Sequence, residues 1–278
     1  MHWHFCLHRR NRTMRCRYGG QHCDRLCLRD HHQGLAGAMN WTLFSIGANG
    51  WGDELLWGFA LTMTLAIAAY VIGTVIGLFA ALALLSKSRI LRPVSAAYGT
   101  IFRSVPELLI LFLTYYGAAL MIRSTFALIG IDLRVSLDAF TAGVVALALV
   151  HGAYTAEVFR GAIISVPTGL REAARSLGMT PFVTFHRIVF PVALRYAFPG
   201  LSNLWMVMIK NTPLVSAIGL ADLIGQANTA GQNTKHYFAF FTAALIAYLL
   251  VSAVSLWGQI RLERNLTRHL PKQGSWSP

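Results

Sequence analysis

Four charged or titratable side chains lie inside long apolar runs of the sequence. They are Arg103, Glu107, His151 and Lys210. A charge in the middle of a bilayer costs from about 3 to above 10 kcal/mol, so residues of this kind mark solute pathways, relays or structural ion pairs. Glu107 follows Pro106, which frees backbone groups and is expected to widen the helix there, so its carboxylate is suited to contact a cationic group in a pathway.

Each of these residues also has a structural interpretation. Arg103 and Glu107 are four residues apart, which is the spacing of an ion pair on one helix face. His151 lies beside Gly152 in the middle of its run, and we expect a hydrogen-bonded core residue there rather than a ligand contact. Lys210 is too far from a span end to snorkel easily, so we expect it to face the bundle or a wet cavity, with a role in gating or in an inter-subunit pair.

Glu157 and Arg160 form a second charged pair, at the end of the third apolar run. Their spacing of three residues predicts an ion pair within one helix. We expect this pair to finish the helix and to be architectural.

Catalytic and phosphate-binding signatures are missing from the sequence. It has no GxxxxGK[ST] loop, no HExxH and no GxSxG motif, and all four Cys lie before residue 28. We therefore expect no enzyme activity, no cofactor and no metal, and energy from ATP would have to come from another subunit.

The composition predicts that long membrane-crossing helices hold these charges. Of the 278 residues, 55% are apolar and 13% are charged, and the mean hydropathy is +0.51, which does not describe a soluble domain. Apolar runs reach the roughly 20 residues needed to cross the hydrocarbon core. We predict an all-α integral membrane protein with five transmembrane helices, at residues 55–85, 94–122, 139–157, 196–221 and 237–260.

Basic residues between the runs predict the orientation of the chain. Most Lys and Arg after residue 39 fall in loops on one side of the five spans, and basic loops stay in the cytoplasm. The amino-terminal segment 40–54 is therefore expected outside, in the periplasm, and the tail 271–278 in the cytoplasm. The net charge of +13 lies in loops and in the first 39 residues rather than on a folded soluble face, which argues against nucleic acid as a partner.

The first 39 residues differ in composition from the rest of the chain. They contain all four Cys and no apolar run long enough for a signal peptide. Cys23, Cys27, His31 and His32 are ligand types at short spacing, so a metal site is one interpretation. Because no CxxC pair is present, we favour a non-native leader upstream of a start at Met39, or a disordered basic tail.

A polar loop, residues 158–195, separates the third and fourth predicted spans. Pro167, Pro181 and Pro191 divide it into short helical pieces. The loop carries six residues at fixed offsets: Glu172, Ala173, Ala174, Gly178, Ile188 and Pro191.

These offsets resemble the EAA signature of ABC-importer permeases, in which only Leu is replaced here, by Phe190. In that family the loop carries a coupling helix that sits in a cleft of the ATP-hydrolysing subunit. Residues 171–177 are helix formers with small Ala173 and Ala174 expected on the surface, and Gly178 can take the left-handed cap that ends a helix. A short exposed helix of this kind can dock as one rigid unit. The alternative is an interfacial helix with a chance Glu-Ala-Ala.

Further segments resemble the polar amino acid subfamily of histidine, octopine, nopaline and arginine permeases, and the likeness covers about residues 55–270. Ser104 stands where that subfamily usually has Gly, and Asn-Thr-Pro at 211–213 replaces a commoner Asp or Ser followed by Ser or Ala. Glu107 favours a cationic amino acid or opine. The segments that carry the likeness are 102–109, 153–161 and 210–215.

The resemblance implies the partners of the chain. They are a cytoplasmic ABC ATPase dimer, a second permease subunit, identical or homologous, and a periplasmic solute-binding protein, in the lipid of a bacterial inner membrane. Two other classes stay open. A secondary transporter would need an inverted repeat, and no matching pair of segments is seen. A membrane scaffold would explain the spans but not the capped Glu-Ala-Ala helix.

Overall fold

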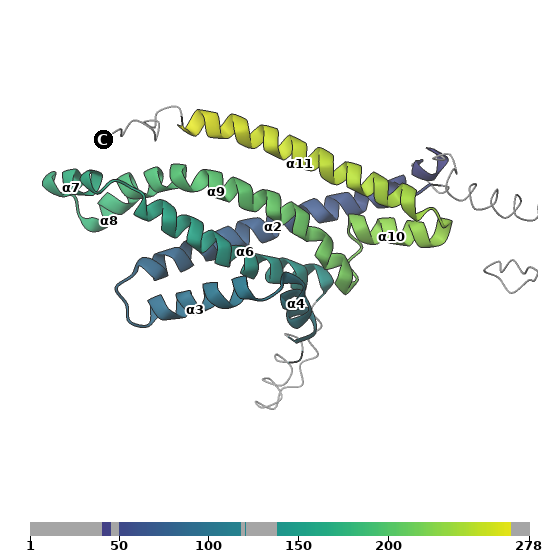
Figure 1. The fold of residues 1–278 in the computed structure, drawn as a ribbon, viewed down its shortest axis with the longest axis horizontal. Helices are drawn as coiled ribbons and strands as arrows, with labels where there is room; N and C mark the ends of the chain where they lie inside the picture. Colours follow the sequence, from purple (N-terminus) through teal and green to yellow (C-terminus); the bar gives the residue numbers. More distant parts are fainter. Residues whose placement is uncertain (1–40, 46–49, 118–119, 121–137, 268–278) are drawn as a thin grey trace, which may run out of the picture. The chain divides into compact units, whose positions relative to one another are not determined.

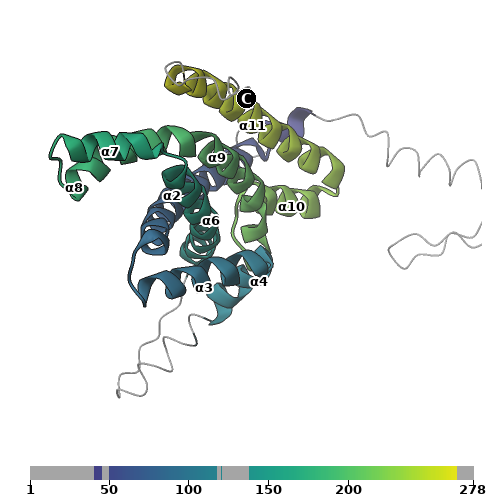
Figure 2. The same cartoon turned by 60° about the vertical axis from the view of Figure 1, so that its left-hand side comes forward.

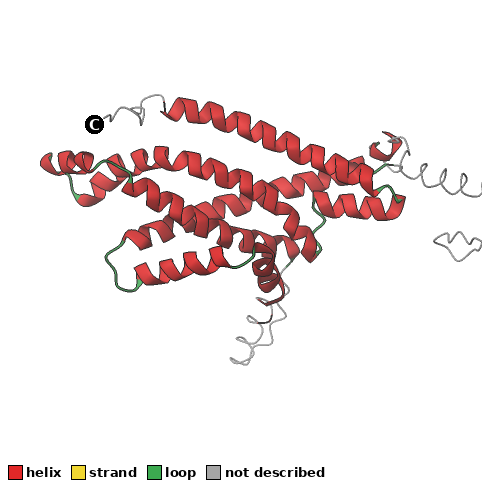
Figure 3. Cartoon of the chain, viewed as in Figure 1, coloured by secondary structure: helices red, strands yellow, loops and turns green. Residues whose placement is uncertain are grey.

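The computed structural model describes residues 41–45, 50–117, 120 and 138–267, and within these ranges all regular structure is helical (Figure 3). The chain divides into two compact units, 1–53 and 54–278. The helices are η1 (Trp41–Phe44), α2 (Gly52–Leu85), α3 (Leu91–Ser104), α4 (Glu107–Phe112), η2 (Leu113–Gly117), α6 (Ala139–Ile164), α7 (Thr168–Ser176), α8 (Pro181–Thr184), η3 (Phe185–Val189), α9 (Phe190–Asn211), η4 (Thr212–Ile218), α10 (Leu223–Thr234) and α11 (Tyr237–Thr267).

Three of these helices are long and apolar enough to cross a membrane by themselves. They are α2, α6 and the Tyr237–Arg264 part of α11. Two further candidates are bent pairs, α3 with the segment Glu107–Gly117 and Pro181–Ile218 with α10. The described residues therefore contain three spans, or up to five if each bent pair is one span. The predicted all-α membrane fold is confirmed, while the count of five and the sidedness stay predictions.

Helix α6 is the centre of the second unit. It contacts α3, α4 and α9, and 67% of its most apolar window is buried, against 33% for α2 and 11% for α11. Figure 1 shows α6 and α9 running side by side, with α2 crossing them and α11 along the outer side of α9. Trp205 Nε1 donates to Ser255 Oγ at 3.2 Å, which joins α9 to α11. The apolar surface that α11 keeps exposed suits contact with lipid.

Small residues let α2 and α6 approach closely. A Cβ on Gly77 would lie 2.8 Å from the carbonyl oxygen of Gly152, and a Cβ on Gly73 would lie 2.7 Å from that of Ala148. Both obstacles are backbone atoms, so they cannot move aside cheaply. Close approach through small residues is the usual way in which membrane helices pack, because lipid provides little hydrophobic drive for association.

The second predicted span, 94–122, is broken rather than continuous. Helix α3 ends at Ser104, Val105 is extended, and α4 begins after Pro106, with a bend of 108° between the two parts. The expectation that Pro106 merely widens a helix is therefore wrong, because proline disfavours the helical conformation in the residue before it. The bend removes the helical register that would have placed Arg103 one turn from Glu107.

A polar segment after the fourth predicted span also forms a helix that the sequence analysis treats as loop. Asp222 starts α10 by accepting a hydrogen bond from Gly225 N at 2.9 Å, and its carboxylate is buried. Asp138 caps α6 in the same way, and the Thr141 hydroxyl and amide hold the pKa of Asp138 below its usual value. An Asp at the N-cap, the position just before the first helical residue, is a strong local signal for the start of a helix.

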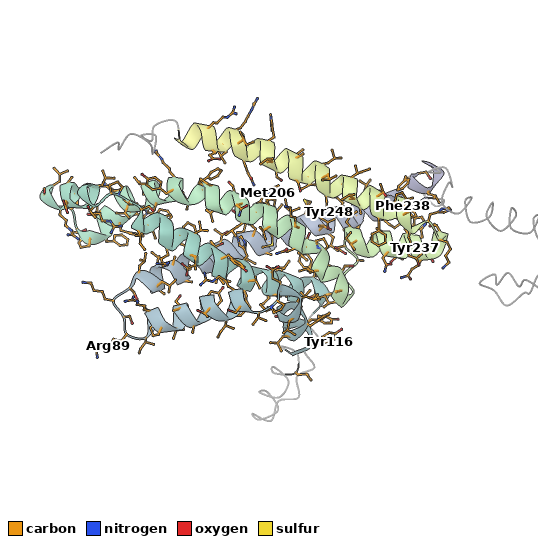
Figure 4. All side chains as sticks on the ribbon, in the orientation of Figure 1. Arg89, Tyr116, Met206, Tyr237, Phe238 and Tyr248 are labelled. Carbon is orange, nitrogen blue, oxygen red and sulfur yellow. The ribbon has the colours of Figure 1, made fainter. Side chains whose placement is uncertain are left out.

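The basic loops of the second unit gather at one end of the bundle. Figures 1 and 2 place the α2–α3 loop, α7, α8 and the C-terminal end of α11 there, and α10 at the other end. Arg89 extends from the α2–α3 loop in Figure 4. The predicted leader 1–39 and the predicted cytoplasmic tail 271–278 lie outside the described residues.

Candidate functional site

Glu107 and Asn211 meet where α4 approaches the end of α9. The Asn211 side-chain amide donates to Glu107 Oε2, although the two residues are 104 positions apart in the sequence. Glu107 is the first residue of α4, where its carboxylate also suits the positive end of the helix. The sequence predicts that Glu107 lies in a pathway but predicts no contact for Asn211, because residue spacing does not indicate which span faces which.

A small hollow of about 20 Å³ opens beside this pair. Its polar edge is formed by Glu107, Asn211, His151 and Tyr154, and the rest of its lining is apolar. A volume of this size holds about one water molecule. Glu107 and His151, predicted separately, are thus brought together, with α4, α6 and α9 contributing to one site.

His151 is a buried member of this site. It is 5% exposed, and its Nε2 lies 3.3 Å from the Thr74 hydroxyl on α2. Its ring centroid lies 4.7 Å from that of Tyr70. The predicted hydrogen bond is present, while the ring also lines the hollow. A role in contact with solute remains a prediction.

Glu157 joins two arginines. Arg160 Nε lies 2.7 Å from Glu157 Oε2, as the predicted pair within α6 requires, and Arg103 Nη2 lies 3.1 Å from Glu157 Oε1. Arg103 folds back along α3, with its Nε 2.8 Å from Gly99 O. The alternative pairing of Arg103 with Glu107 is therefore wrong for the described residues, because the bend at Pro106 turns Glu107 away. All three charged side chains are about one-third to two-fifths exposed.

Lys210 lies on an exposed side of α9, next to Asn211. The ion pairs of the described residues both involve Glu157, so Lys210 has no carboxylate within 4 Å there. Asn203 and Val207 are exposed on the same helix face, and Val207 also lines the hollow. This face is thus continuous with the site at Glu107.

Helix α7 ends in a left-handed glycine turn, as the sequence predicts. Gly178 has φ +73°, Met179 N donates to Ala174 O at 3.1 Å, and Gly178 N donates to Arg175 O at 2.9 Å. This pair of bonds is the Schellman motif. A Cβ on Gly178 would meet nothing within 4 Å, so the requirement for glycine comes from the backbone conformation rather than from space.

The two alanines of the motif have different surroundings. Ala173 is exposed, whereas Ala174 is 1% exposed and packs inward. The expectation that both lie on the surface is wrong, because consecutive residues of a helix point about 100° apart. Glu172 and Gly178 are exposed, and Pro191 is at the start of α9, while Ile188 is half-buried in η3.

Exposed apolar side chains surround the turn after α7. Leu177 and Phe182 are each 78% exposed, at the end of α7 and in α8. Helices α7 and α8 lie at the same end of the bundle as the basic loops (Figure 1). An apolar surface on a polar, arginine-bearing segment is typical of a protein contact.

A bundle of long apolar helices is typical of a multi-span membrane protein. The family model described as "binding-protein-dependent transport system inner membrane component" matches residues 73–268. The chain belongs to this family and is an inner-membrane permease.

Two curated relatives and one solved structure illustrate the likeness. The nopaline transport system permease protein NocQ of Agrobacterium fabrum is 37% identical over 236 residues, which cover 84% of this chain and 100% of the relative. The histidine/lysine/arginine/ornithine transport system permease protein HisQ of Salmonella typhimurium is 38% identical over 215 residues, 77% of this chain and 94% of the relative. A crystal structure of an amino acid ABC transporter with histidines superposes with a TM-score of 0.68 at 33% identity, over 77% of this chain and 95% of that one.

Proposed function

We propose that the chain is the permease subunit of an ABC importer that carries a polar, cationic amino acid or opine and is driven by a separate ATPase. The observation that carries this proposal is the similarity to the nopaline permease over that protein's full length. The histidine/lysine/arginine/ornithine permease supports the same solute class. Membership of a binding-protein-dependent family favours this function over a secondary transporter or a scaffold.

Coupling to the ATPase is assigned to α7 and the turn after it. The exposed members of the motif near the capped end of α7 are Glu172, Ala173 and Gly178. The whole motif consists of Glu172, Ala173, Ala174, Gly178, Ile188 and Pro191. The Schellman cap fixes the direction of the chain after α7, so a push on this helix is passed to α8 and η3 rather than absorbed by a flexible loop. The exposed Leu177 and Phe182 supply apolar area for a groove in the partner.

Contact with the solute is assigned to the site at Glu107, with Arg103, His151 and Lys210 as further candidates. A carboxylate that lines a small hollow, as Glu107 does, can bind a cationic group through charge-assisted hydrogen bonds. Asn211 holds the carboxylate in place by donating to only one of its oxygens. The hollow of about 20 Å³ is too small for an amino acid, which supports a pathway completed by a second permease subunit.

The complete importer then contains two permeases, an ATPase dimer on the cytoplasmic side and a periplasmic binding protein. The clustering of basic loops at the α7 end favours that end as the cytoplasmic one. On this orientation α10 and Asp222 lie at the periplasmic end.

Co-purification of the ATPase subunit tests the coupling role. Leu177→Asp places a charge in the proposed contact without touching the core, because Leu177 is 78% exposed. Ile90→Asp is the matched control, since Ile90 is 73% exposed and belongs to the α2–α3 connection, which Figure 1 shows at the same end of the bundle. We expect Leu177→Asp to remove most of the ATPase from the purified complex and Ile90→Asp to leave it bound. Equal retention in both variants contradicts docking at α7.

A further inference from the structure

A cavity lies beside α7, at the ends of α2 and α6, and is separate from the site at Glu107. It has a volume of about 420 Å³, within the range of about 300–1,000 Å³ typical of small-molecule pockets. The last residues of α2 and α6, Leu85 and Ile164, both line it. The cavity therefore lies beside the C-terminal ends of both apolar helices.

The wall of this cavity combines apolar and basic residues. Leu82, Leu85, Ile164 and Phe185 supply the apolar part, and the guanidinium-bearing Arg171 and Arg175 come from α7. Neither arginine belongs to the ion pairs of the described residues, both of which involve Glu157. No acidic residue lines the cavity. Its charge therefore complements an anion attached to an apolar body.

Two buried polar atoms along the same wall have no hydrogen-bond partner within the described part of the chain. They are Arg171 Nε and Thr184 Oγ1, and the whole of Thr184 is only 6% exposed. Arg171 Nη2 donates to Ile163 O at 2.7 Å, which holds the guanidinium in place, while Nε has no partner among the described residues. Buried polar groups in native proteins almost always have partners. Both residues line the basic cavity, so acceptor oxygens of a ligand bound there would supply the missing partners.

We propose that this cavity binds one anionic phospholipid of the surrounding membrane. The phosphate accepts from Arg171, Thr184 and Arg175, and an acyl chain lies against Leu85 and Phe185. Arginine suits this task because its planar fork binds phosphate oxygens in pairs. The lipid would thereby tie α7 to the ends of α2 and α6.

Lipid titration tests the proposal. The full chain, purified with the subunits that accompany it, is titrated with phosphatidylglycerol or phosphatidylcholine in detergent, and bound lipid is counted by native mass spectrometry. We expect one phosphatidylglycerol to bind saturably per chain, and phosphatidylcholine to bind at least about tenfold more weakly, a difference of about 1.4 kcal/mol.

Three variants distinguish this site from general attraction to basic surfaces. Arg175→Gln removes an exposed charge and Thr184→Val removes an unpartnered hydroxyl, so each should weaken phosphatidylglycerol binding about tenfold while the chain stays folded. Arg187→Gln, an exposed arginine of η3 that does not line the cavity, should change it little.

Several results overturn the proposal. Equal binding of the two lipids, or an equal loss in Arg187→Gln, would mean unspecific attraction. Displacement of the lipid by inorganic phosphate or glycerol phosphate would mean a site for a soluble anion. Binding that begins only after the ATPase has been stripped off would mean that a protein partner covers the cavity.

Discussion

Glu107 illustrates how one side chain is positioned by three separate parts of the chain. The bend at Pro106 brings it to the start of α4, the end of α9 supplies Asn211, and α6 supplies the rest of the hollow. Because the bond from Asn211 reaches only Oε2, the carboxylate keeps an oxygen for another donor. This arrangement allows its charge to be tested without disturbing its position.

Glu107→Gln removes the charge and keeps an amide oxygen that can accept from Asn211. We expect transport of a cationic amino acid to weaken by about 1.5–3 kcal/mol, the contribution of a hydrogen bond to a charged group, or roughly 10- to 150-fold in apparent affinity. Transport of a neutral amino acid should change far less. Uptake of both solutes is measured at equal amounts of assembled complex, and an equal loss for the two solutes refutes contact with the substrate cation.

Which single residues face each other was only partly predictable from the sequence. Residues within one helix could be paired from their spacing, as for Glu157 and Arg160. Contacts between helices could not, because Arg103 finds Glu157 at a separation of 54 positions only once the bend at Pro106 is known. The contact of Asn211 with Glu107 could not be predicted for the same reason, because it depends on how α9 is placed against α4.

At the scale of elements, α7 combines a fixed end with an exposed surface. Its glycine cap was predictable, since helix formers followed by Gly are a local signal. The burial of Ala174 was not predictable, because it depends on how α7 is placed against the rest of the chain, including η3 and α8.

Gly178→Ala tests the cap through the backbone alone, since a Cβ there would meet no atom within 4 Å. Alanine in the left-handed conformation costs about 1–2 kcal/mol, so we expect the end of α7 to loosen and less solute to be moved for each ATP hydrolysed. Gly178→Asn is the matched control, because Asn tolerates this conformation. The ratio of uptake to ATP hydrolysis is compared for the two variants, and indistinguishable ratios argue against a role for the cap in coupling.

The contact between α2 and α6 leads to a separate prediction about stability. Gly77→Ala places a methyl group against the backbone of Gly152, so we expect a loss of about 1–3 kcal/mol, the usual cost of overpacking. Gly258→Ala in α11 is the control, since a Cβ there would meet nothing within 4 Å. Thermal unfolding in detergent should show a lower midpoint only for Gly77→Ala. A similar midpoint for both variants would mean that α2 and α6 do not pack this closely.

At the scale of the whole molecule, long apolar runs predicted most of the architecture. The uninterrupted runs near 55–85, 139–157 and 237–260 correspond to α2, α6 and α11. Helix α6 continues to Ile164, seven residues beyond its predicted end, so the ion pair of Glu157 and Arg160 is present but the expectation that it finishes the helix is wrong. The two runs with internal prolines became bent pairs, whose angles depend on packing that composition does not record.

The uneven distribution of basic residues between the two ends of the bundle was also predictable, because it depends on loop composition alone. Loops rich in Arg and Lys are found together at the α7 end in Figure 1. Helix α10 was missed because Asn, Thr, Gln and Gly dominate it, and only its Asp222 cap marks its start. Tyr248 is labelled on α11 in Figure 4, and its hydroxyl lies 3.5 Å from the Thr212 hydroxyl. This contact joins α11 to η4.

Solute uptake by a reconstituted complex tests the central claim most directly. The chain is placed in proteoliposomes with its ATPase and any second permease, and labelled arginine or octopine is supplied with the binding protein. We predict uptake that requires both ATP and the binding protein and that persists when a proton ionophore collapses the ion gradient. Uptake that proceeds without ATP and stops with the ionophore would contradict the account and would identify the chain as a secondary transporter.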